Sequence, residues 1–172
     1  MAKAAERLAA AITRGEKIAI FGDYDVDGAT STALLHRFLT AIGGKPRVYI
    51  PDRMTEGYGP NAPALLALKR EGASVCITVD CGITAFAPLE AASEAGLDMI
   101  VVDHHVAEPS LPRAVAVVNP NRLDEDSPHR QLAAVGVAFL LVVALNRKLR
   151  EEGWYRARPE PDLLQWLDLV AL

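Results

Sequence analysis

The sequence predicts an α/β protein: a doubly wound, mostly parallel sheet of five strands with helices on both faces. Short apolar, β-branched segments alternate along the chain with segments of helical periodicity. Polar or acidic residues follow most of the apolar segments, as expected where a strand leaves the core. The chain has 172 residues, of which 51% are hydrophobic and 23% charged, a balance that suits one globular domain and excludes disorder or a fibre.

A helix, a strand and a second helix open the chain. Leucine and alanine at helical spacing predict the first helix over residues 3–13, with Gly15 as its stop signal. The apolar segment 17–21 predicts a strand that runs directly into Gly22 and a series of aspartates. Residues 29–42 predict the next helix, which the glycine pair after it would end.

The alternation of strand and helix then continues. The expected strands cover residues 47–50, 74–79, 98–102 and 114–118, and the expected helices among them cover residues 61–70 and 84–95. Asn119-Pro120-Asn121 opens a polar loop that extends through Gln131. A long apolar helix over residues 132–145 and a last helix from about Asp162 complete the chain.

Composition and charge exclude several classes of protein. A net charge of −4 excludes a uniformly basic nucleic-acid-binding surface, so a phosphate-bearing ligand would need metal ions or a few arginines. The longest apolar run, Leu132 to Leu145, is shorter than the roughly 18 residues of a membrane span, and the N-terminal segment lacks the apolar core of a signal peptide. Cys76 and Cys81 are expected to be reduced thiols. These features predict a cytoplasmic protein without membrane contact.

Acidic and histidine side chains follow three of the predicted strands. Because the carboxyl ends of parallel strands meet at one edge of a sheet, where ligands bind, these side chains are expected to lie together. The three segments are Asp23-Tyr24-Asp25-Val26-Asp27-Gly28, Asp80-Cys81-Gly82 and Asp103-His104-His105. The sequence therefore predicts one cluster of five aspartates and two histidines.

Such a cluster indicates bound metal. Neighbouring carboxylates raise one another's pKa unless a cation neutralises them. Carboxylate oxygens with one or two imidazoles suit Mn²⁺ or Mg²⁺ better than Zn²⁺, and the ligands suffice for two ions. Two ions about 3.5 to 4 Å apart would activate a water molecule and clamp a phosphoryl group. Asp80, alone at its strand end between the other two segments, is the natural bridging ligand.

Other interpretations explain less of the pattern. A lone aspartate at a strand end is most often a helix cap, but capping does not account for three acidic segments at three strand ends. An EF-hand loop would need a glutamate where the chain has Leu34. A phosphatase of the haloacid-dehalogenase type, with Asp25 as nucleophile, would leave Asp80 and the Asp103-His104-His105 segment unexplained.

The motifs together resemble those of a known family. FGDYDVDGATSTALL, PDRMTEGYG, VDCGIT, VVDHHV and NPN followed by AAVGVAF are similar to the successive signatures of the DHH phosphoesterases, specifically the RecJ-type single-strand exonucleases. The resemblance extends over nearly the whole chain. It implies a two-metal phosphodiesterase, using Mn²⁺ or Mg²⁺, that degrades single-stranded DNA from the 5′ end to mononucleotides in repair and recombination.

The resemblance also implies which side chains hold the two ions. Asp23 and Asp25 would hold the first ion, Asp27 and His104 would hold the second, and Asp80 would bridge them.

Further roles follow from the same resemblance and from the nearby basic residues. Asp103 and His105 would lie behind the metals or on the phosphate side, and His105 could donate to a phosphate oxygen or serve the leaving group. Arg53, in the loop after the second strand, and His129 or Arg130, before the long apolar helix, are candidate contacts to the phosphates of single-stranded DNA.

The sequence departs from the family pattern at its end. RecJ-type chains continue from LDLVAL into a Gly-Thr-Val-Ala-Asp segment whose aspartate completes the second metal site, whereas this sequence ends at Leu172. The resemblance thus implies that residues 1–172 are a DHH catalytic domain cut before the fourth metal-binding motif, without the C-terminal substrate-binding domain. A weakly bound second ion and low or no nuclease activity are then expected of this chain alone. A helicase and a single-strand binding protein, if partners, would contact regions outside it.

Two other functions stay open. A phosphodiesterase of the same superfamily that cleaves short oligonucleotides or cyclic dinucleotides would use the same metal chemistry. Such relatives usually have a histidine at the position of Asp23, and they lack the PDRMTEGYG and AAVGVAF segments. A non-catalytic scaffold would have lost metal ligands, whereas every ligand position within this chain is filled.

Overall fold

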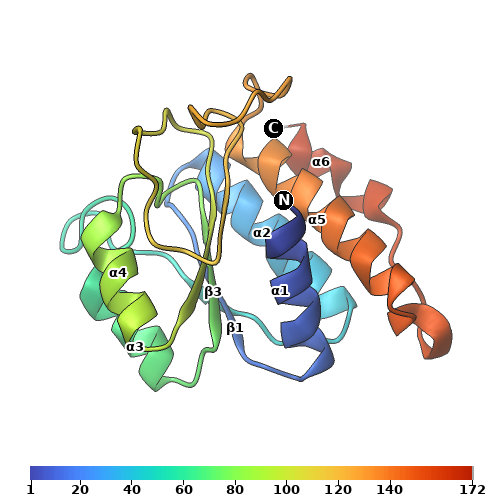
Figure 1. Cartoon of the computed structure of the whole chain (residues 1–172). Helices are drawn as coiled ribbons and strands as arrows, with labels where there is room; N and C mark the ends of the chain where they lie inside the picture. The colour runs from blue at the N-terminus through green and yellow to red at the C-terminus, as the bar shows by residue number, and fades with distance from the viewer. Residues whose placement is uncertain (172) are drawn as a thin grey trace.

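Five parallel strands form the centre of the fold, which is described for residues 1–171 by a computed structural model (Figure 1). The strands are β1 (Ile18–Phe21), β2 (Arg47–Tyr49), β3 (Val75–Val79), β4 (Asp98–Val102) and β5 (Ala116–Val118). Their order in the sheet is β2-β1-β3-β4-β5, and each neighbouring pair is parallel. The predicted doubly wound α/β fold is confirmed.

Two layers of helices cover the sheet. The first layer contains α1 (Ala2–Thr13), α2 (Val26–Ala41) and α5 (Ala134–Glu151), and the second contains α3 (Ala62–Arg70) and α4 (Phe86–Glu94) (Figure 1). After α5 the chain forms the short helical turns η1 (Trp154–Ala157) and η2 (Leu163–Trp166) and ends with α6 (Leu167–Val170). The chain leaves β1 through α2 on one face and β3 through α4 on the other. The carboxyl ends of β1 and β3 therefore flank the topological switch point, where ligands bind in open α/β sheets.

Strand burial explains why these segments read as continuous apolar runs. In β1, Ile18 and Ile20 belong to the core beneath α1, α2 and α5, whereas Ala19 and Phe21 belong to the core beneath α3 and α4. Successive side chains of a strand point to opposite faces, so a strand covered on both faces must be apolar at every position.

Several element boundaries differ from those expected. Helix α2 begins at Val26 rather than at residue 29, because the Asp25 side chain caps it by accepting a hydrogen bond from the backbone N–H of Gly28 at 2.9 Å. Asp27 therefore lies on the first turn of a helix and not in a loop. Helix α5 continues to Glu151, and the expected last helix is instead η2 followed by the short α6.

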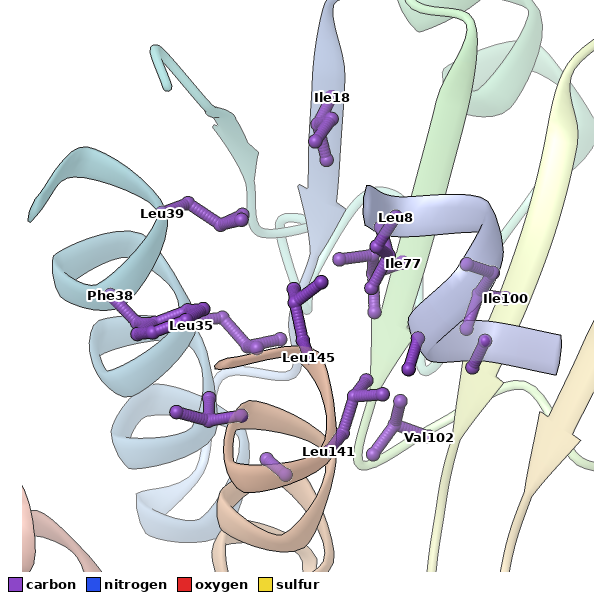
Figure 2. Packing of buried hydrophobic residues seen from close by; sticks show 14 of the residues in the cluster. Leu8, Ile18, Leu35, Phe38, Leu39, Ile77, Ile100, Val102, Leu141 and Leu145 are labelled. Atoms are coloured by element: carbon purple, nitrogen blue, oxygen red, sulfur yellow. The ribbon is translucent and has the colours of Figure 1, made fainter. Parts of the chain in front are cut away.

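Helix α5 is the central element of the larger core. Leu141 and Leu145 are fully buried and lie between α2, which contributes Leu35 and Phe38, and the strands with α1 (Figure 2). Among residues 1–171 no helix combines the length and the hydropathy needed to cross a membrane. The apolar run of α5 is thus a core helix, as its length predicts.

We expect Leu141→Ala to lower the free energy of unfolding by about 2 to 5 kcal/mol, because it removes buried atoms from a site closed on all sides. Val143 lies on the same helix and is 40% exposed, so Val143→Ala is the matched control, with a loss of about 0.5 kcal/mol or less. Urea unfolding of the two variants measures both values. Equal losses would contradict the central position of α5.

Candidate metal centre

The loop after β1 brings two aspartates to the carboxyl edge of the sheet. Asp23 is 3% exposed, and its Oδ1 accepts a hydrogen bond from the N–H of Tyr24 at 2.8 Å. Burial raises the pKa of Asp23, and the neighbouring charge of Asp25 raises it further. A Cβ atom at Gly28 would lie 2.6 Å from the Cβ of Asp23, so only glycine lets α2 start this close to the strand end.

Asp80 follows β3 in an unusual backbone conformation. Its φ of 60° is positive, and the backbone is held on two sides: the Asp80 N–H donates to the carbonyl of Val102 at 3.0 Å, and the Tyr58 hydroxyl donates to the Asp80 carbonyl at 2.9 Å. Its carboxylate Oδ1 is buried and has no hydrogen-bond partner. Burial, followed by the nearby carboxylates with Asp25 first, raises the pKa of Asp80 to about 8.

Asp103, after β4, shapes the turn that carries both histidines. Its Oδ1 accepts hydrogen bonds from the backbone N–H groups of His104 at 2.8 Å and His105 at 3.1 Å, and lies 2.7 Å from His105 Nδ1. Its Oδ2 accepts from the N–H of Ile83 at 3.0 Å. The Asp103 side chain is 1% exposed and accepts hydrogen bonds on both oxygens, so it supports the turn.

Two groups of potential ligands meet at Asp80. One ligand atom each from Asp23, Asp25 and Asp80 lies within 4.8 Å of the others, and the same holds for Asp80, His104 and His105. The two groups come from three strand ends and share one residue. Asp80 is therefore the carboxylate that the two groups have in common.

Asp27 approaches the same cluster from the first turn of α2. The His104 Nε2 atom lies 3.3 Å from Asp80 Oδ1 and 3.8 Å from Asp27 Oδ2. The contact to Asp80 lacks the geometry of a hydrogen bond, because Oδ1 is without a hydrogen-bond partner. The His104 imidazole thus lies close to the carboxylates of Asp27 and Asp80 without a hydrogen bond to either.

These residues fit a divalent cation. The buried, unpartnered oxygen of Asp80 and the raised pKa values of Asp23 and Asp80 both indicate negative charge that the protein itself leaves uncompensated. The donors are carboxylate oxygens and imidazole nitrogens, which suit Mn²⁺ or Mg²⁺.

The basic residues singled out in the sequence lie in different places. Arg53 lies over the ring of Tyr24 at 5.2 Å, and its charge lowers the pKa of Asp23 as one of the smaller influences on that group, so it is close to the cluster. The Arg130 guanidinium instead donates to the carbonyl of Glu125 at 3.4 Å. Arg130 also pairs with Asp126 at 3.7 Å, and within residues 1–171 no contact joins the side chain of His129 or Arg130 to the aspartates of the cluster.

Three further residues support the centre and have no assigned role in the sequence analysis. Tyr58 bonds to the Asp80 carbonyl, and its ring lies 6.3 Å from that of His105. Asn119 and Asn121 donate to carbonyls of the histidine turn. All three lie in motifs quoted above, PDRMTEGYG and NPN, but only the folded chain shows what their side chains contact.

Fold and cluster together define a class: a doubly wound α/β protein with a carboxylate and imidazole centre at the switch point of its sheet. Residues 17–172 match the DHH family, N-terminal domain, and the chain belongs to this family.

Relatives in bacteria are similar over nearly the whole chain. The single-stranded-DNA-specific exonuclease RecJ of Dickeya dadantii is 43% identical over 99% of this chain, and that of Bacillus subtilis is 46% identical over 88%. A crystal structure of exonuclease RecJ bound to manganese matches with a TM-score of 0.82 at 39% identity over 98% of this chain and 40% of that chain. The chain spans 30% of the length of the Dickeya protein and 19% of that of the Bacillus protein.

We expect Asp80→Asn to raise the melting temperature measured without divalent ions at pH 8 and to abolish the rise that Mn²⁺ causes in the unchanged chain. The surroundings raise the pKa of Asp80 from 3.8 to about 8 in the folded chain. The free energy of unfolding therefore falls as the pH rises from about 4 to about 8, because ionisation of Asp80 is less favourable in the folded state. Asparagine removes that charge, and with it the shared ligand.

Melting curves at pH 5 and pH 8, with and without Mn²⁺, measure both effects. Asp168, exposed on α6, provides the control Asp168→Asn, which should leave the Mn²⁺ response intact. A full Mn²⁺ response in Asp80→Asn would contradict a ligand role for Asp80.

Proposed function

We propose that this chain is the catalytic part of a metal-dependent phosphodiesterase that degrades single-stranded DNA from the 5′ end to mononucleotides. One observation carries the proposal: two ligand groups from three strand ends share Asp80 at the switch point of the sheet. Identity of about 40% to RecJ exonucleases supports the substrate, and the manganese-bound RecJ structure supports the use of a divalent ion.

In this proposal Asp23 and Asp25 hold one Mn²⁺ or Mg²⁺ ion, Asp27 and His104 hold a second, and Asp80 contacts both. Bound ions of this kind supply Lewis acidity to a phosphodiester and to the water that attacks it. They also offset the negative charge of the cluster, which would otherwise repel the DNA backbone.

We propose His105 as the group that handles a proton in this reaction. Its Nδ1 lies 2.7 Å from the Asp103 carboxylate, so Nε2 is the ring nitrogen that remains for a substrate. The imidazole is 49% exposed and can reach a substrate. Nε2 can donate to a phosphate oxygen or to the leaving oxygen.

The surface around the centre suits unpaired bases better than a duplex. Met54 is 91% exposed, Val106 78% and Tyr58 54%, and all three lie in loops that also carry residues of the centre or its supports. Aromatic and apolar side chains stack on the faces of unpaired bases without sequence preference. Arg53 adds a positive charge beside Asp23 for a phosphate.

The proposal extends to the protein in its cellular setting. Because the chain spans 30% or less of these relatives, we propose that strand binding and the last metal ligand come from segments corresponding to the rest of their length. We propose that the protein acts in the cytoplasm on single-stranded DNA. A helicase or a single-strand binding protein would contact those other segments.

Digestion of a single-stranded DNA oligonucleotide, labelled at either end, tests the proposal. The full-length gene product that carries this chain, with Mn²⁺, should release labelled mononucleotides first from the 5′ end. Asp80→Ala should lower the rate more than roughly 100-fold, beyond the usual effect of residues that only support a metal ligand. Glu90→Gln, at an exposed position on α4, should leave it unchanged.

Other outcomes would contradict the proposal in different ways. If long strands survive while short oligonucleotides or cyclic dinucleotides are cleaved, the substrate is wrong and the metal chemistry stands. If Mn²⁺ binds and nothing is cleaved, the protein is a scaffold.

A further inference from the structure

The turn that carries both histidines is held by two asparagines that follow β5. The Nδ2 atom of Asn119 donates to the carbonyl of His105 at 2.9 Å, and the Nδ2 atom of Asn121 donates to the carbonyl of His104 at 2.5 Å. The two asparagines are also joined, because Asn119 Oδ1 accepts a hydrogen bond from the N–H of Asn121 at 2.7 Å. Pro120, between them, fixes its own φ. The segment 119–121 therefore donates hydrogen bonds to the carbonyls of two consecutive residues, His104 and His105.

The opposite side of the same turn is held by Asp103. Its carboxylate accepts from the N–H groups of both histidines, so the donors and the acceptors of this backbone are both bonded to side chains. Few degrees of freedom remain for the turn. The His104 imidazole is thereby kept with Nε2 at 3.3 Å from Asp80 Oδ1.

The asparagine pair is anchored independently of the histidines. Asn119 is 3% exposed, and β5, which precedes it, pairs with β4 in the sheet. The Asp103 N–H donates to the carbonyl of Val118 at 3.0 Å, which ties the strand end before Asn119 to the strand end before the histidines. The pairing of β4 with β5 therefore fixes the position of Asn119 relative to the histidine turn.

We propose that Asn119 and Asn121 are positioning residues for the metal centre: they set the place of the His104 imidazole and so the affinity for the divalent ion it binds. The proposal rests on the proposed function, because that function supplies the ion. Groups that orient a metal ligand from behind commonly change metal affinity by about 10-fold to 100-fold when removed.

The Asn121 side chain also reaches the loop before α5. Its Nδ2 lies 3.3 Å from the carbonyl of Arg130, so the asparagine connects the histidine turn to the loop that carries His129 and Arg130. Within residues 1–171 neither of those side chains contacts the aspartates of the cluster, yet the Arg130 carbonyl is bonded to a residue that contacts the histidine turn. The connection gives this loop a fixed place relative to His104.

The chain offers a matched control for loss of a buried asparagine. Asn146 in α5 is 3% exposed, donates to Glu160 at 2.6 Å and accepts from the Tyr155 hydroxyl at 2.6 Å. Its partners lie beyond the end of α5 and include none of the candidate ligands. Asn146→Ala thus removes a comparable pair of side-chain hydrogen bonds from another part of the fold.

The test measures Mn²⁺ affinity by calorimetry and thermal stability without metal for Asn121→Ala, Asn119→Ala and Asn146→Ala, each made in the full-length gene product that carries this chain. We expect all three to lower the melting temperature, because each loses hydrogen bonds. Only Asn121→Ala and Asn119→Ala should weaken Mn²⁺ binding, by about 10-fold or more. Asn121 is more exposed than Asn119, so Asn121→Ala keeps the test valid if Asn119→Ala fails to fold.

A second readout needs no metal. In the metal-free chain, NMR signals of the His104 imidazole, assigned with His104→Asn, should shift in Asn121→Ala and stay in place in Asn146→Ala. Mn²⁺ affinity within twofold of the unchanged chain, or unshifted His104 signals, would overturn the positioning role. If the unchanged full-length gene product binds no Mn²⁺, the proposed function fails, and the His104 signals alone decide the role of the asparagines.

Discussion

The Asp80 carboxylate lies buried at the point where β1, β3 and β4 end, with other carboxylates close by and one oxygen that no protein group satisfies. A buried ionised group without a partner costs free energy, and like charges nearby add to that cost. The surrounding structure is arranged to keep it there in spite of this. Its backbone has a positive φ and is held by the Val102 carbonyl and the Tyr58 hydroxyl. Backbone strain kept in this way is typical of functional sites. A bound cation would offset the charge cost of the carboxylate.

Two buried aspartates at the same edge illustrate how surroundings assign roles. Asp103 and Asp80 are each 1% exposed and each follows a central strand. Both oxygens of Asp103 accept backbone hydrogen bonds, so its charge is compensated within the protein and serves to shape the histidine turn. Asp80 has an unpartnered oxygen, so its charge is available to a ligand from outside. An aspartate thus supports the histidine turn at position 103, whereas at position 80 it has an oxygen available to a cation.

The chain carries net negative charge, so it would need bound cations to attract a nucleic-acid substrate. The net charge is −4, and the cluster that would meet the phosphodiester is itself acidic. Bound divalent ions would offset most of this negative charge, so in the proposed function affinity for the cation and affinity for the DNA would be coupled. Under that proposal, the residues that support the cluster would affect the chemistry through the cation, without touching the substrate.

The sequence by itself determined the fold class, because apolar strands buried on both faces leave a pattern that alternates with helices and needs no tertiary information. It also placed the acidic residues at strand ends, and the rule that parallel strands end at one edge predicted that they would meet. The start of α2 could have been read from the Asp25 cap, but the same side chain also looked like a ligand, and local pattern does not separate the two.

Only the tertiary structure decided which groups are satisfied and which are not. Asp103 and Asp80 are alike in sequence context, and their different hydrogen bonding arises from Ile83 and from the histidine turn. Contacts such as Asn121 to His104, 17 positions apart, depend on how β5 pairs beside β4. Hydrogen bonds between distant segments follow from packing in three dimensions, and periodicity along the chain carries no record of them.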